Sequence, residues 1–139
     1  MKKILWAIGL LALAACAGCW ANETDSGSSA PEAAGRYWDF DDVLVPSSMQ
    51  LNKDESMLVV SEGHNGGLLT FKDNLELTSL VNFFTVNMSK DGWLHKASFK
   101  YPNVALLFAK PDKTCIIHII ESTFSTSVYI WVAPSAGSR

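Results

Sequence analysis

The sequence predicts an α+β domain in which one amphipathic helix packs across one face of a curved antiparallel sheet of about six or seven strands. Two observations lead to this class. Short apolar runs recur between turns that contain Gly, Pro and Asn, which is typical of antiparallel strands. Only one stretch has the apolar spacing of a helix. The expected order is therefore β-β-β-α-β-β-β-β, and a chain of 139 residues has room for one such domain.

The folded part is expected to begin at Arg36, where the composition becomes aromatic and aliphatic, and to extend to residue 134. A first strand is expected at residues 42–45. The apolar runs at residues 56–61 and 66–71 flank a turn that contains Gly, so they predict a β-hairpin. Four strands are expected after the helix, at residues 93–100, 104–110, 114–121 and 127–133. Their short connections favour sequential antiparallel pairing.

The helix is predicted from five apolar residues that follow the pattern i, i+3, i+4, i+7 and i+11, which places them on one face. These residues are Leu77, Leu80, Val81, Phe84 and Met88. The helix is expected to begin at Glu76 or Thr78 and to end at Gly92. Trp93, directly after this glycine, is expected in the core.

The last predicted strand alternates between aliphatic and aromatic side chains. Tyr129 and Trp131 alternate with Val128, Ile130 and Val132. Because successive side chains of a strand point to opposite faces, we expect the aliphatic set to face the helix and the aromatic pair to face outward. Tyr129 and Trp131 are therefore the candidate partner surface. The alternative is that residues 36–40 fold back over this face and bury both rings.

Residues 1–15 have the organisation of a secretory signal peptide. Lys2 and Lys3 form a positively charged start, and an uncharged apolar run follows from Ile4 to Ala12. This stretch is shorter than the roughly 20 residues with which a helix crosses a bilayer. Cleavage is therefore expected rather than a permanent transmembrane anchor.

The segment Leu13-Ala14-Ala15-Cys16 resembles the bacterial lipobox, in which an aliphatic residue and two small residues precede a cysteine. The resemblance implies that Cys16 receives diacylglycerol, that cleavage occurs before it and that its amine can be acylated as well. Two or three acyl chains make membrane anchoring stable. Two alternatives are ordinary signal cleavage with Cys16 merely nearby, and Cys19 as the acylated cysteine. Cys19, however, lacks an aliphatic residue three positions before it.

The expected location is the cell membrane or, in a Gram-negative host, the periplasmic face of the outer membrane. Ala17 follows the lipobox cysteine where an Asp would resemble an inner-membrane retention signal. Residues 16–35 have the composition of a flexible linker, and residues 135–139 form a short tail. Removing residues 1–15 takes away two lysines and no acid, so the net charge of −3 falls by two, to −5. An acidic protein of this kind is a poor candidate for nucleic-acid binding.

No spacing of titratable residues predicts catalysis, a metal site or a cofactor. The three histidines form neither an H-x-x-x-H nor an H-x-E pattern. Cys115 and His118 are three residues apart, so an extended strand directs them to opposite faces, away from a shared zinc ion or a nucleophile and base pair. Cys115 is expected to be a buried apolar side chain, with a disulfide to Cys19 as the alternative. The acidic residues at 39–42 lack the other ligands of a calcium loop and are expected to be solvated.

The segments Phe83-Phe84, Asn87-Met88 and Gly92-Trp93, followed by Leu107 to Cys115, resemble a pattern in small uncharacterised bacterial lipoproteins. This resemblance implies no activity. The sequence as a whole therefore predicts a lipid-anchored protein of the cell envelope whose domain is a non-catalytic binding or assembly module for an envelope protein. A small-ligand carrier with a groove between helix and sheet is the alternative, and an enzyme is the weakest hypothesis.

Overall fold

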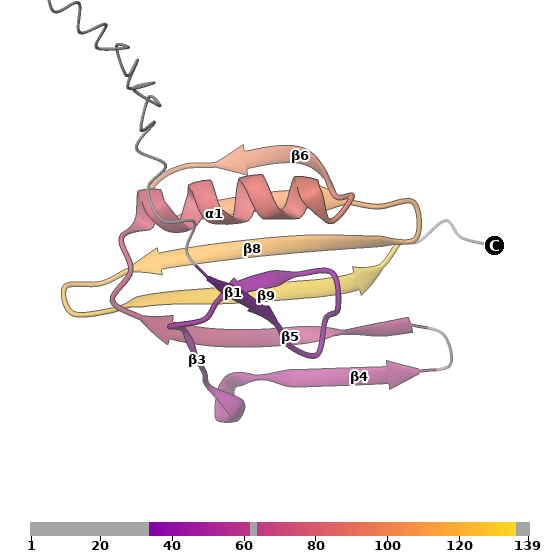
Figure 1. Cartoon of the computed structure of the whole chain (residues 1–139), viewed down its shortest axis with the longest axis horizontal. Coiled ribbons are helices and arrows are strands. Elements are labelled where there is room, and N and C mark those ends of the chain that lie inside the picture. The colour runs from indigo at the N-terminus through magenta and orange to yellow at the C-terminus, as the bar shows by residue number, and fades with distance from the viewer. Residues whose placement is uncertain (1–33, 62–63, 136–139) are drawn as a thin grey trace, which may run out of the picture. The chain divides into compact units, whose positions relative to one another are not determined.

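The computed structural model describes residues 34–61 and 64–135, all of which belong to one compact unit. One helix packs against an open antiparallel sheet, which confirms the predicted α+β class (Figure 1). The predicted signal peptide, Cys16 as the predicted acylation site, Cys19 and nearly all of the predicted linker lie outside the described residues, as does most of the C-terminal tail.

The larger sheet contains seven strands, and every strand pair in it is antiparallel. Its order is β3 (Gln50–Leu51), β5 (His64–Asp73), β9 (Thr126–Pro134), β8 (Lys113–Glu121), β7 (Val104–Ala109) and β6 (Leu94–Phe99). Strand β4 (Met57–Ser61) pairs with β5 on the same side as β3, and a short 3-10 turn at Lys53–Glu55 separates β3 from β4.

The expectation of purely sequential pairing is wrong for β5 and β9. The hairpin β4–β5 and the strands from β6 to β9 pair in chain order. The last strand, β9, also pairs with β5 on its other edge. Helix α1 (Leu77–Lys90) separates β5 from β6, so β5 has no sequential neighbour for its second edge. Pairing with β9 satisfies that edge and places Phe71 beside Val128 in the core.

The first predicted strand is also misplaced. Residues Leu44–Pro46 form β2, which pairs with β1 (Gly35–Tyr37) in a separate two-stranded sheet and not with the larger one. Neither β1 nor β3 was expected. Pro46 ends β2, and because proline has no backbone N–H, it cannot extend the ladder of a central strand.

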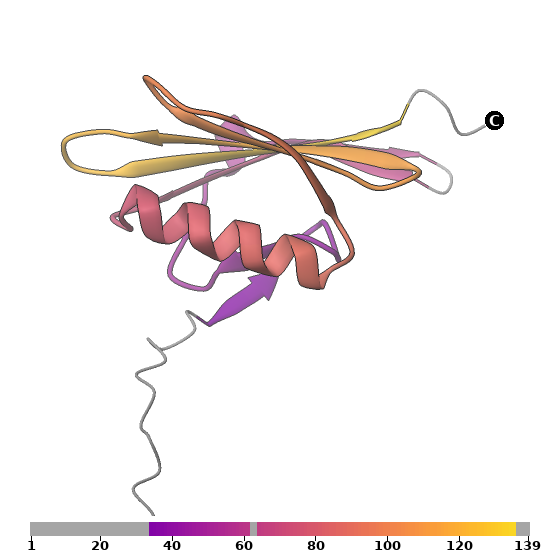
Figure 2. The same ribbon diagram turned by 90° about the horizontal axis from the view of Figure 1, so that it is seen from above.

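Helix α1 lies across one face of the larger sheet, together with the small sheet (Figure 2). Its buried side includes Leu80, Phe84 and Met88, as the sequence predicted. The helix ends in a Schellman motif, in which the N–H of Trp93 donates to the carbonyl of Met88 and Gly92 has a φ of +81°. Within the described part of the chain, no helix combines the length and apolarity needed to span a bilayer.

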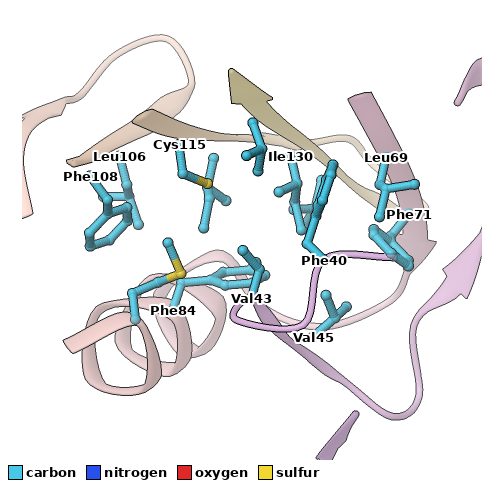
Figure 3. Packing of buried hydrophobic residues seen from close by; sticks show 14 of the residues in the cluster. Phe40, Val43, Val45, Leu69, Phe71, Phe84, Leu106, Phe108, Cys115 and Ile130 are labelled. Carbon is cyan, nitrogen blue, oxygen red and sulfur yellow. The ribbon is translucent and has the colours of Figure 1, made fainter. Parts of the chain in front are cut away.

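Large side chains from both layers fill the core between the helix and the sheet (Figure 3). Phe84 from the helix and Phe71 and Phe108 from the sheet have no exposed surface. Phe40, Val43 and Val45 from the N-terminal segment also enter this cluster. Trp93 and Cys115 are buried as expected, at 2% and 0% exposure. This core occupies the inner face of the sheet and leaves the outer face as the candidate binding surface.

Candidate binding surface

Strand β9 divides its side chains between the two faces of the sheet. Val128, Ile130 and Val132 are at most 3% exposed and belong to the core. Tyr129 and Trp131 point to the outer face, as the alternation predicts; Tyr129 is half-buried and Trp131 is 47% exposed. In Figure 2, no described segment covers this face of the sheet. The partner role of the two aromatic residues stays a prediction.

Trp131 lies in the middle of an apolar row that crosses six strands of the outer face. Each residue of the row is paired directly with the next one on the neighbouring strand. The apolar row consists of Ala97, Leu107, Ile116, Trp131, Leu68 and Met57. Three of these, Ile116, Trp131 and Met57, are among the exposed large hydrophobic residues of the domain. The outer face therefore presents a band of apolar surface across the strands.

Two glycines produce a hollow at one end of this row. Gly66 and Gly67 of β5, next to Leu68, line this hollow together with Met57 and Trp131, and its volume is about 310 Å³. Gly67 has a φ of +137°, and a Cβ there would lie 2.1 Å from the carbonyl oxygen of Met57. Only glycine fits this backbone without strain. The missing side chains leave room for an apolar group of a partner beside the Trp131 ring.

Few charges interrupt this surface. Among the outward side chains that the structure describes on β5, β7, β8 and β9, only Lys72 carries a charge and only His118 is a histidine. Lys72 lies at the margin and pairs with Glu55 at 3.4 Å. The His118 ring lies against Tyr129, with centroids 6.2 Å apart. The surface is thus suited to an uncharged, apolar partner.

The alternative in which residues 36–40 cover the aromatic face is wrong. Trp38 packs on the inner face instead, with its ring 5.5 Å from that of Phe71. Phe40 is 4% exposed within the core. Tyr37 donates a hydrogen bond to Asp91 at the end of the helix, at 3.0 Å. The N-terminal segment packs on the helix side, where Phe40, Val43 and Val45 bury apolar surface in the core.

His95 and His118 lie on opposite faces of the sheet, and each contacts an aromatic ring. His95 lies on the inner side of β6, with Nε2 2.8 Å from Ser98 Oγ and its ring against Phe108. His118 lies on the outer face, whereas Cys115 of the same strand is buried on the inner face. Burial raises the pKa of the Cys115 thiol far above its ordinary value. Within residues 34–61 and 64–135, no cluster of three or more His, Cys, Asp or Glu could hold a metal ion.

Asp42 corrects the expectation that the acidic residues at 39–42 are simply solvated. Its carboxylate accepts hydrogen bonds from Lys110 and from Lys113, the latter at 2.8 Å. The backbone carbonyl of Asp42 accepts a 2.7 Å hydrogen bond from the Trp93 indole, and both lysines lie over that ring. These contacts fix the N-terminal segment to the turn between β7 and β8. Sequence reasoning missed them because these partners are distant in the chain: Trp93 is 51 residues and Lys110 is 68 residues from Asp42.

We expect Asp42→Asn to lower the free energy of unfolding at pH 7 by about 2 kcal/mol, because the change leaves two partly buried ammonium groups without their counter-charge. Burial by itself would raise the pKa of Asp42, but the hydrogen bonds from Lys110 and Lys113 outweigh it and hold the pKa below its ordinary value. The unfolded chain therefore takes up this proton first as pH falls. The contribution is complete above roughly pH 5 and is lost as pH falls through the folded-state pKa.

Urea unfolding of the wild type and Asp42→Asn at a series of pH values measures this effect. The difference between the two proteins should shrink as pH falls below 4. A difference that stays constant down to pH 2 would show that the Asp42 charge contributes nothing. Asp41→Asn, an exposed neighbour, serves as the control and should change stability by less than about 0.5 kcal/mol.

In comparisons with known proteins, no family model matches this sequence, and no match is found among curated proteins or solved structures. The function therefore has to be inferred from the residues and geometry of this chain.

Proposed function

We propose that the protein is a lipid-anchored protein of the bacterial cell envelope whose domain acts as a non-catalytic binding module, with the outer face of the sheet as its partner surface. The observation that carries this proposal is the apolar row through Trp131, which no other described segment covers, although the domain has a filled core on the other face. Contiguous apolar patches of this kind are uncommon on monomeric proteins and mark interaction sites.

An apolar protein surface is the partner that fits this face best. Trp and Tyr dominate the binding energy of many interfaces when they lie near the centre of the contact. Trp131 occupies that place here, with Ile116 and Leu68 as direct neighbours on either side. The hollow beside Trp131 adds a recess for one inserted side chain. A flat sheet face with one recess resembles a docking surface rather than an enclosed ligand site.

The small-ligand carrier is less well supported. A carrier needs space between the helix and the sheet, and that space is occupied by Phe84, Met88, Phe71 and Phe108, all at most 1% exposed. Three hollows among the described residues lie elsewhere: on the outer face, beside β3 and β4, and at the turn before β9. None of these three is lined by a histidine, so they offer no support for an enzyme either.

The anchor is proposed from the sequence alone. Lipid on Cys16 would hold the domain at a membrane surface, and residues 16–35 would let it reach a partner. In a Gram-negative host, the residue after Cys16 favours the periplasmic face of the outer membrane. A membrane-confined module needs only modest affinity, because tethering raises its effective concentration toward neighbouring envelope proteins.

The test combines Tyr129→Ser with Trp131→Ser in the full-length protein. We expect this double variant to lose the envelope protein that chemical cross-linking of intact cells joins to the wild type. Its stability should fall by no more than about 2 kcal/mol, because Trp131 is largely exposed and Tyr129 only half-buried. The measurement is affinity purification after cross-linking, together with thermal unfolding of both proteins.

Val86→Ser provides the matched control, because Val86 is 51% exposed but lies on the solvent side of the helix. This variant should keep the cross-linked partner. If the double variant folds and keeps every partner of the wild type, the outer face is not the binding surface. A loss of more than about 4 kcal/mol in the double variant would instead show that the two rings serve the core.

A further inference from the structure

The two edges of the larger sheet are built differently. Strand β6, at one edge, has an irregular register between His95 and Ala97, with Lys96 in the irregularity, and helix α1 packs beside it. A bulge and a lysine are two of the devices by which proteins keep an edge strand from pairing with another chain. Strand β4, at the other edge, keeps a regular register with β5 over all five of its residues.

Strand β4 carries none of these protective devices. Its residues Met57 to Ser61 include no charge and no proline. Met57, Leu58, Val59 and Val60 are all exposed, at 60%, 41%, 54% and 77%. Since side chains alternate along a strand, apolar surface is exposed on both faces of β4. A strand of this composition in the centre of a sheet would be covered by neighbours, yet among the described residues only β5 pairs with it.

Within the described part of the chain, the free edge of β4 also leaves backbone groups without partners. In an antiparallel pair, residues alternate between hydrogen bonding to the neighbour and pointing their N–H and C=O groups away from it. Every second residue of β4 therefore presents unpaired groups on the side opposite β5. Such a row of donors and acceptors, flanked by apolar side chains, is a template for another extended strand.

We propose that β4 pairs with β4 of a second copy of this chain, antiparallel and around a twofold axis, so that the two sheets become continuous. A twofold interface brings the same residues of both copies together, so it requires a strand that tolerates itself. Pairing centred on Val59 sets Val59 against its counterpart and Leu58 against Val60 of the other copy. The absence of charge along β4 means that no like charges are opposed in this arrangement.

The twofold pairing of β4 is also compatible with the apolar row on the outer face. A twofold axis perpendicular to the sheet places the outer faces of both copies on the same side. The Met57 ends of the two apolar rows then lie on either side of the central pair of Val59 residues. Five-residue strands bury less than the roughly 1,200 Å² of a stable interface, so we expect a dimer with micromolar affinity in solution. Anchoring in a membrane would raise the dimer population by confinement. The inference rests on β4 and does not depend on a partner for Trp131.

Cysteine cross-linking of the full-length protein in bacterial membranes tests the pairing. Val59→Cys is introduced into a Cys19→Ser background, in which Cys115 is buried and out of reach. Mild oxidation should give a disulfide-linked product of twice the chain mass. Phe99→Cys in the same background is the matched control, because Phe99 is 63% exposed but lies on the blunted edge strand β6. It should give at least about fivefold less dimer.

A second variant separates strand pairing from chance collision. Adding Val60→Lys to Val59→Cys places a charge on β4 in both copies and should reduce the linked dimer about tenfold, whereas Phe99→Lys should leave it unchanged. Unchanged thermal unfolding would show that the lysine variant folds, as expected for a residue with 77% exposure. Equal dimer yields from the Val59 and Phe99 cysteines, no dimer at all, or a product joined to a different protein would each overturn self-pairing.

Discussion

Replacing Phe84 by alanine is expected to lower the free energy of unfolding by about 3–5 kcal/mol, the largest single effect on stability that we anticipate. Phe84 has no exposed surface and lies on the helix face that meets the sheet. Its ring makes an edge-on contact with Phe83, with centroids 5.6 Å apart. Alanine would leave a cavity that the surrounding sheet cannot close without moving whole strands.

Such a loss would take away much of the stability of a domain of this size, which is typically about 5–15 kcal/mol. Urea unfolding monitored by circular dichroism measures the change. Val86→Ala on the same helix is the control; Val86 is 51% exposed, so its replacement should cost less than about 0.5 kcal/mol. Equal, small effects of both substitutions would mean that α1 does not pack on the sheet through Phe84.

Cys16→Ser is expected to abolish fatty-acid incorporation completely, the largest effect on the state of the protein in the cell. The lipobox resemblance implies diacylglycerol on the thiol of Cys16, with acylation of the amine after cleavage, and serine has no thiol to alkylate. Each buried methylene contributes about 0.8 kcal/mol to membrane binding, so losing two or three chains removes the anchor. Metabolic labelling with an alkyne fatty acid, followed by gel fluorescence, measures the incorporation.

Cys19→Ser is the matched control for this substitution and should keep the label at the level of the wild type. The two variants therefore decide between the lipobox cysteine and the other cysteine of the same segment. Label that survives in Cys16→Ser but disappears in Cys19→Ser would transfer the anchor to Cys19. Label lost in neither variant would contradict lipidation of this segment.

Much of the secondary structure follows from short-range patterns. The spacing of Leu80, Phe84 and Met88 predicted the buried face of the helix, and Gly92 its end. Alternation in β9 predicted which side Trp131 would take. These features depend on the periods of helices and strands, which a window of a few residues contains. These predictions are confirmed because the apolar face of a helix or strand has to be buried against another element, whichever element that is.

Other parts of the candidate surface could not be predicted in this way. The apolar row through Trp131 requires the registers of six strands, and β9 takes its central place only because β5 needs a second neighbour. The sequence around Met57 and Val59 predicts a strand. No neighbouring residue indicates that this strand, β4, lies at an edge of the sheet. The hollow beside Trp131 likewise depends on the pairing of Gly67 with Val132 of β9.

The sequence by itself determined the α+β class, the buried faces of α1 and β9, and the expectation of a lipid anchor at Cys16. Only the tertiary structure decided which strands are neighbours, that residues 35–46 cover the inner face, and that Asp42 meets Lys110 and Lys113. The physical reason is the range of the forces. Helix and strand periodicity is encoded between residues a few positions apart, whereas strand order and ion pairing result from competition among distant segments for the same edges and the same buried surface.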